Sequence, residues 1–181
     1  MTLNADPQKS IHEADAAYQG ADYALAASKY VVAQQAYNAA GDALMAAEMA
    51  NNASVALLKA GNAAAALAAC EQTDLIFAQA GDIRRQAVAL SNQATALEAL
   101  KRNERALELY QRASDLLKQI NETEMRAFVL KSMSFLQFRS GKKFDAMATM
   151  RIALDTQRKL TPRERLLKWL LGVVFKLLGS A

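Results

Sequence analysis

The sequence repeats itself with a fixed period of 40 residues over most of its 181-residue length. The period shows as columns of small or core-type residues that recur without insertions. The columns are Ala26, Ala66, Ala106 and Ala146; Tyr30, Cys70, Tyr110 and Met150; and Ala33, Thr73, Ala113 and Ala153. A fixed period of this length is typical of stacked supersecondary units, each of which buries its apolar face against its neighbours. The repeat therefore predicts an array with an extended binding surface.

Each 40-residue unit divides into two helical halves of about 20 residues. Apolar residues such as Leu90, Ala94 and Leu97 recur at the three- and four-residue spacing of a helix face. Glycines at 41 and 81 suit helix ends, and Asp42, Asp82 and Glu122 suit the starts of the following helices. The pattern predicts helices at 7–19, 22–39, 42–60, 63–79, 82–100, 103–119, 122–140, 143–160 and 162–178. The expected fold is therefore all-α.

A family resemblance rests on the second half of each unit. The stretch Asp22-Tyr23-x-x-Ala26-x-x-x-Tyr30-x-x-Ala33 resembles the second-helix signature of the tetratricopeptide repeat. The stretch from Asn92-x-Ala94 through Leu100, followed by Ala106, Tyr110 and Ala113, resembles the repeat in the same way. The unit is longer than the usual 34 residues of that family, and Leu90 or Leu130 stands where the family has a large aromatic residue. In its length the unit is similar to the repeats of kinesin light chains.

The resemblance implies a right-handed superhelical solenoid. It would hold four helix-turn-helix repeats within residues 1–161, at about 7–40, 41–80, 81–120 and 121–160. Residues 162–181 would follow as a C-terminal amphipathic helix that caps the array or docks on it.

In tetratricopeptide arrays the first helix of each unit lines a concave groove, so the resemblance also implies a set of groove residues. The set is Asn52, Val55, Leu58, Lys59, Asn92, Thr95, Lys131, Phe135, Phe138 and Arg139. A repeated asparagine offers both a donor and an acceptor to the backbone of an extended peptide. The apolar members would form pockets for alternate side chains. The alternative is that Asn52 and Asn92 only tie neighbouring helices together.

No pattern of catalytic or metal-binding residues is present. His12 is the only histidine, and no Cys/His cluster could hold zinc. Cys70 is the only cysteine, and its repeat column predicts a buried thiol without a reactive role. We therefore expect neither an enzyme nor a bound cofactor. A nucleic-acid partner is not expected, because the basic part of the chain has no recognised nucleic-acid-binding module.

The charge is divided unevenly along the chain. Residues 1–81 hold 3 Lys and Arg against 8 Asp and Glu, whereas residues 82–181 hold 19 against 10. One interpretation is that the two ends of the array are simply solvated by different charges. The other is that the basic part faces an acidic partner or an anionic membrane surface. The start of the sequence has no signal-peptide pattern. We expect a cytoplasmic protein, with a peripheral position on the inner membrane face as an alternative.

The last segment combines a narrow basic stripe with a wide apolar arc. Arg165, Lys168 and Lys176 fall on the stripe, and the arc includes Trp169, Leu170, Val173, Phe175 and Leu177. This helix could dock on the last repeat under a second copy, enter a groove of its own chain or of a partner, or lie in a membrane interface. Burial against protein is favoured, because terminal helices commonly seal arrays.

The sequence therefore predicts a scaffold or adaptor that binds a peptide or a helix of another protein. The alternatives are a structural unit that self-assembles into oligomers, and a peripheral membrane adaptor tethered by the last helix.

Overall fold

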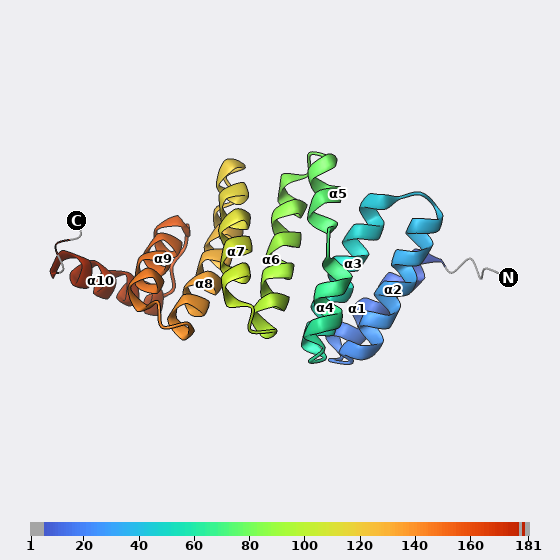
Figure 1. Ribbon diagram of the computed structural model, residues 1–181, viewed down its shortest axis with the longest axis horizontal. Helices are drawn as coiled ribbons and strands as arrows, with labels where there is room; N and C mark the ends of the chain where they lie inside the picture. The colour runs from blue at the N-terminus through green and yellow to red at the C-terminus, as the bar shows by residue number, and fades with distance from the viewer. Residues whose placement is uncertain (1–5, 178, 180–181) are drawn as a thin grey trace. The chain divides into compact units, whose positions relative to one another are not determined.

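The computed structural model describes residues 6–177 and 179, and these residues form ten α-helices (Figure 1). The helices are α1 (Pro7–Gln19), α2 (Tyr23–Ala39), α3 (Ala43–Lys59), α4 (Ala63–Cys70), α5 (Thr73–Gln79), α6 (Ile83–Ala99), α7 (Asn103–Gln119), α8 (Thr123–Arg139), α9 (Lys143–Thr156) and α10 (Pro162–Leu177). The predicted all-α fold of helix-turn-helix repeats is confirmed. The chain divides into two compact units, unit 1 (Met1–Ala106) and unit 2 (Leu107–Ala181), which are treated separately below.

One residue with positive φ separates successive helices every 20 residues, at Ala21, Gly41, Gly61, Gly81, Lys101, Asn121 and Gly141. At Gly41, φ is 77°, and the N–H of Asp42 returns to the carbonyl of Tyr37 at 2.9 Å, which ends α2. The Asp42 carboxylate then accepts the N–H of Met45 at 3.0 Å and caps α3. A single tight turn thus stops one helix and starts the next.

The predicted capping of helix starts is confirmed at Asp42 and Asp82. Asp82 accepts the N–H of Arg85 at 2.9 Å, as Asp42 does in the turn before. Glu122 occupies the same position before α8, but its longer side chain makes no capping hydrogen bond.

Small residues allow the helices of a pair to approach closely. The column of Ala26, Ala66, Ala106 and Ala146 is buried, and so is the facing column of Ala14, Ser54, Ala94 and Ser134. In unit 2 the hydroxyl of Ser134 donates to the carbonyl of Ala146 at 2.7 Å, directly across the contact of α8 with α9. A larger side chain at either position would force the two backbones apart.

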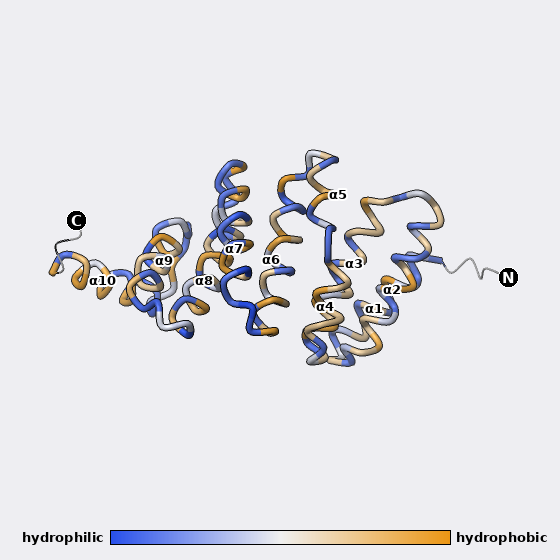
Figure 2. Tube along the Cα trace, in the orientation of Figure 1, coloured by the Kyte–Doolittle hydropathy of each residue, from blue (hydrophilic) through white to orange (hydrophobic). Residues whose placement is uncertain are grey.

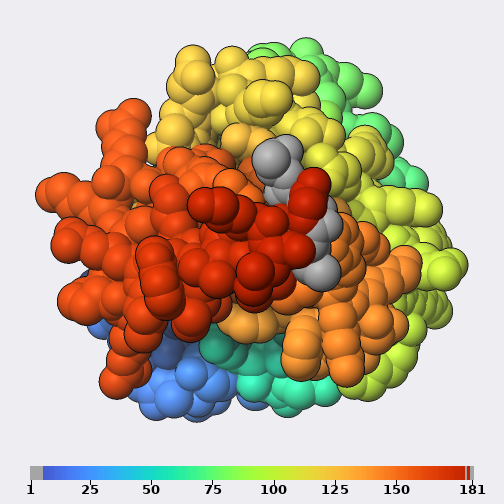
Figure 3. Space-filling model, turned by 90° about the vertical axis from the view of Figure 1, so that its left-hand side faces the viewer, coloured from blue at the N-terminus to red at the C-terminus, as the bar shows by residue number. Residues whose placement is uncertain are grey.

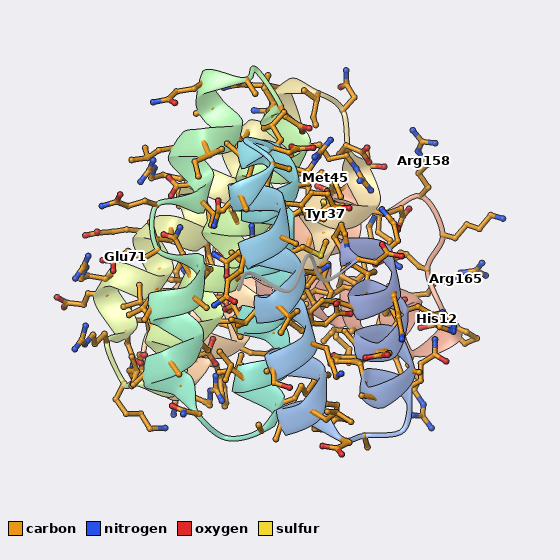
Figure 4. All side chains as sticks on the ribbon, turned by 90° about the vertical axis from the view of Figure 1, so that its right-hand side faces the viewer. His12, Tyr37, Met45, Glu71, Arg158 and Arg165 are labelled. Carbon is orange, nitrogen blue, oxygen red and sulfur yellow. The ribbon has the colours of Figure 1, made fainter. Side chains whose placement is uncertain are left out.

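The prediction of a single helix at 63–79 is wrong, because the structure has two helices there, α4 and α5. Glu71 is extended, with ψ at 133°, and Gln72 is left-handed, with φ at 63°. The carbonyl of Cys70 instead accepts hydrogen bonds from the Thr73 hydroxyl at 2.8 Å and from Gln93 Nε2 on α6 at 3.0 Å. These bonds satisfy a carbonyl that a continuous helix would have used. The side chain of Glu71 points away from the helices at the break (Figure 4).

The helix expected at 143–160 also ends earlier, at Thr156. Gln157 is extended, and its side-chain oxygen accepts from Lys131 Nζ on α8 at 2.6 Å. The N–H of Arg158 donates to Glu124 Oε1, also on α8, at 2.9 Å. Polar side chains of α8 therefore hold the segment between α9 and α10 in a non-helical path.

Candidate functional site

Within unit 2, the last helix, α10, packs on α9 through one of its faces. Leu171 and Phe175 are buried against Leu154 of α9. The Phe175 ring meets Phe144 edge to face at 5.6 Å, and the Arg151 guanidinium lies 5.4 Å from the same ring. These contacts give α10 a fixed inner face and a fixed outer face.

Polar groups fix the start of α10. The Glu164 carboxylate accepts the N–H of Thr161 at 2.8 Å, and the Thr161 hydroxyl accepts the N–H of Glu164 at 3.3 Å, which together form a capping box. Lys131 Nζ lies 2.5 Å from the other Glu164 oxygen, and Lys168 Nζ lies 2.7 Å from Asp155. The hydrogen bond from Lys131, followed by those from Thr161, lowers the pKa of Glu164 to about 2. The only acidic side chain of α10 is therefore ionised and bound to α8.

Docking of α10 leaves an apolar pocket where it meets α8 and α9. The pocket has a volume of about 260 Å³ and is lined by Ser134, Phe135, Phe138, Ala146, Met147, Met150, Leu167 and Leu171. Phe135 is 60% exposed and Phe138 is 59% exposed. Figure 3 shows α10 in red lying across the orange helices α8 and α9. Exposed aromatic rings beside an apolar hollow are typical of binding sites.

The outer face of α10 is also apolar. The apolar residues exposed on this face are Leu166, Trp169, Leu170, Val173 and Leu177. Figure 2 shows hydrophobic positions recurring along this helix. Among the helices in the described part of the chain, none combines the length and hydropathy needed to cross a membrane.

In unit 1, asparagine and glutamine side chains join neighbouring helices. Asn92 Nδ2 on α6 donates to Asn51 Oδ1 on α3 at 3.4 Å, and Asn51 Nδ2 donates to the carbonyl of Ala47 at 3.1 Å. Gln93 Nε2 donates to Asp74 Oδ1 at 2.8 Å as well as to the carbonyl at the helix break. The side-chain amide of Asn92 therefore joins α6 to α3, which is the role that the alternative to peptide binding gives to this residue.

The groove residues predicted from the sequence fall in different units. Unit 1 carries Asn52, Val55, Leu58, Thr95 and Asn92, all half-buried, and the exposed Lys59; unit 2 carries Lys131, Phe135, Phe138 and Arg139 on α8. Of these, the structure brings Phe135 and Phe138 together in one pocket. Lys131 instead holds α10 in place.

The residues predicted on the last helix also divide in two. Phe175 is buried and Lys168 is ion-paired, whereas Arg165, Trp169, Leu170, Val173, Lys176 and Leu177 are exposed. The sequence reading missed Leu167, Met147 and Met150 as pocket residues. Leu167 belongs to the apolar arc of the last helix, so the sequence contained its signal, but the two methionines resemble ordinary core positions of a repeat.

Cys70 is fully buried, as its repeat column predicts. Burial raises the pKa of its thiol, which keeps the group protonated at neutral pH. The thiol hydrogen of Cys70 is directed to the carbonyl of Ala66, at 3.3 Å. This cysteine is a packing residue.

Comparison with known proteins identifies the fold. No family model matches the chain, and no curated protein matches it. The crystal structure of BtubC (BKLC) from P. vanneervenii superposes with a TM-score of 0.72, covering 92% of this chain and 70% of that chain at 21% sequence identity. The likeness shows an all-helical repeat fold.

Proposed function

We propose that the protein is a non-enzymatic scaffold, and that the pocket of unit 2 binds an amphipathic helix of a partner protein. The observation that carries the proposal is the exposure of Phe135 and Phe138, at 60% and 59%, beside an apolar hollow. Two aromatic rings left in water are a source of binding free energy when a partner covers them. A helix presents apolar residues at spacings of three and four, which suits a short pocket of this kind.

The methionines of the pocket suit an interaction surface. Met147 and Met150 line it and are half-buried. Methionine is unbranched and adjusts its shape to different apolar side chains. The pocket can therefore accept Leu, Ile or Phe from a partner without a change of fold.

The excess of positive charge in unit 2 indicates which residues should flank the apolar stripe of the partner helix. Residues 107–181 hold 14 Lys and Arg against 7 Asp and Glu. Lys142 in the turn between α8 and α9 and Lys143 at the start of α9 are both exposed, next to the helices that form the pocket. We therefore expect the partner helix to carry acidic residues beside its apolar stripe, and its association to slow as salt rises.

The repeat type supports the same class of function for unit 1. The 40-residue period resembles the repeats of kinesin light chains, and the helical-repeat fold is similar to that of BtubC. In this proposal Val55, Leu58 and Asn52 on α3 contact an extended segment of a partner.

The experiment uses synthetic amphipathic peptides and the methionine methyl groups as reporters. One peptide carries glutamates beside a leucine stripe, and a matched peptide carries lysines there instead. The acidic peptide should shift the NMR signals of Met147 and Met150 and leave those of Met45 and Met49 in unit 1 unchanged. Phe138→Ala should weaken its binding at least tenfold. Phe128→Ala, at an exposed phenylalanine of α8 outside the pocket, should not.

Two results would contradict the proposal. The first is that neither peptide moves the signals of Met147 and Met150. The second is a stable oligomer by light scattering that dissociates in the Phe138→Ala variant, because a second copy of the chain would then occupy the pocket.

A further inference from the structure

We propose that the outer face of α10 binds the surface of an anionic membrane. This inference is independent of the pocket. It rests on a helix whose inner face is already used for docking and whose outer face is both apolar and bordered by cations.

The outer face is preformed. The capping box of Thr161 and Glu164, the Lys131 contact and the buried Phe175 hold α10 as a helix before any ligand arrives. Peptides that fold only at a membrane lose conformational entropy when they bind. In this protein α10 is already helical before binding, so no further conformational entropy is lost in forming the helix at the membrane. Each apolar side chain on the outer face can therefore contribute directly to the free energy of binding.

The apolar content and the length of α10 suit a position in the plane of the membrane. Leu166 is 57% exposed, Trp169 is 62% exposed and Leu170 is 46% exposed, and Val173 and Leu177 continue the same face. The 16 residues of α10 extend for about 24 Å. That is shorter than the hydrocarbon core of about 30 Å, but long enough to lie along the interface. Trp169 is of the residue type that prefers the headgroup boundary.

The charges of α10 select an anionic surface. Arg163, Arg165 and Lys176 are exposed on this helix. The nearby acidic side chains are paired with cations, because Glu164 contacts Lys131 and the exposed Asp155 contacts Lys168. The solvent-facing part of α10 is therefore positive, as in helices that lie on anionic lipids.

A membrane fits this face better than a second copy does. A two-fold contact through the outer face would place Arg165 and Lys176 against the same residues of the other copy. Unit 2 also has twice as many cationic as acidic residues, 14 against 7, so its copies repel one another. An anionic bilayer offers the opposite charge and a flat apolar layer to the same helix.

The test measures partitioning of the full chain onto vesicles. Trp169 is the only tryptophan, so its fluorescence reports on this helix alone. Vesicles of phosphatidylcholine mixed with phosphatidylglycerol should shift its emission to the blue, and pure phosphatidylcholine vesicles should shift it much less. Replacing Arg165 and Lys176 together by glutamine should lower the partition coefficient about thirtyfold. Replacing Arg105 and Lys118, which are also exposed, should change it little.

A matched pair of leucine variants tests the apolar face. Leu166→Gln with Leu170→Gln should lower partitioning at least tenfold, and circular dichroism should show that the helices remain. Leu25→Gln with Leu75→Gln alters leucines of similar exposure in unit 1 and should leave partitioning unchanged. The pocket variant Phe138→Ala should still bind vesicles, which separates this inference from the proposed function.

The proposal is overturned if anionic vesicles leave Trp169 emission and sedimentation unchanged. It is also overturned if the Leu166 and Leu170 variant partitions as the unaltered protein does. A salt-independent dimer that this variant dissociates would show that a second copy covers the face instead.

Discussion

Lys131 on α8 lies 2.5 Å from Glu164 on α10, and this ion pair joins the last helix pair to the helix that follows it. The same lysine donates to Gln157 at 2.6 Å, so one side chain holds both the linker and the start of α10. The pocket depends on this attachment, because Leu167 and Leu171 of α10 line it.

The Glu164 contact predicts a specific pH dependence of stability. The pKa of Glu164 is lowered from 4.5 to about 2 in the folded protein. A carboxyl with a lowered pKa stabilises the folded state above its unfolded pKa, and this contribution is lost as the pH falls from 4.5 toward 2. The thermal midpoint of the protein should therefore exceed that of Glu164→Gln at neutral pH, and the difference should shrink through this window.

The control for this prediction is Glu104→Gln. Glu104 is exposed in the first turn of α7, and its variant should not reproduce the effect. A constant difference between the protein and Glu164→Gln at all pH values would show that the charge of Glu164 does not contribute.

Gln93 should be important for the stability of unit 1. Its amide nitrogen donates to the Cys70 carbonyl at 3.0 Å and to Asp74 at 2.8 Å, at the break between α4 and α5. Gln93→Ala removes one hydrogen bond from the buried Asp74 and one from the Cys70 carbonyl, so we expect a loss of about 1–3 kcal/mol in the free energy of unfolding. Gln35→Ala, on the exposed face of α2, should change it by less than about 0.5 kcal/mol. Equal effects of the two variants in urea denaturation would contradict this role.

The sequence predicts local features of this chain better than features that depend on distant contacts. Gly41 and Asp42 were predicted as a helix end and a helix start because the backbone preferences of glycine and the capping bond of aspartate act within a few residues. The break after Cys70 was missed because it depends on Gln93, which lies 23 residues away along the chain. Helical spacing continues through the break, so no local signal contradicted a single helix.

The same distinction applies to the candidate site. The sequence predicts that the last helix is too apolar to stand alone, and it selects Phe135 and Phe138 by their repeat columns. It does not predict that Leu167 lines the same pocket as Phe138, because that placement depends on which face of α10 docks on α9. Docking is decided by Phe175 against Phe144 and by Lys168 against Asp155, and these pairs have no periodic signature.

Ala21 suits its turn poorly, and the consequence can be measured. Ala21 has a φ of 60°, in the left-handed region that costs an L-residue with a Cβ about 1–2 kcal/mol. Ala21→Gly removes this strain but adds freedom to the unfolded chain, so we expect a net gain of about 0.5–1 kcal/mol. Ala40 has a helical φ of −82° in the equivalent turn after α2. Ala40→Gly should therefore destabilise the protein, and a common sign for the two variants in denaturation experiments would contradict this explanation.

Phe175 should control whether α10 stays docked. It is only 6% exposed and packs against Phe144 and the Arg151 guanidinium. Truncating a buried phenylalanine to alanine typically costs about 3–5 kcal/mol. Helix α10 is attached to α8 and α9 mainly through this residue, Leu171 and two ion pairs. We therefore expect Phe175→Ala to release α10 while the preceding helices stay folded.

Hydrogen exchange measured by mass spectrometry resolves this local opening. Peptides covering residues 162–177 should exchange much faster in Phe175→Ala, whereas peptides from α8 and α9 should keep most of their protection. Leu177→Ala is the matched control, because Leu177 is on the same helix but 81% exposed, and it should leave exchange unchanged. If Phe175→Ala leaves α10 protected, Leu171 and the ion pairs suffice for docking. If it exposes α8 and α9 as well, α10 folds as part of one cooperative body with the last helix pair.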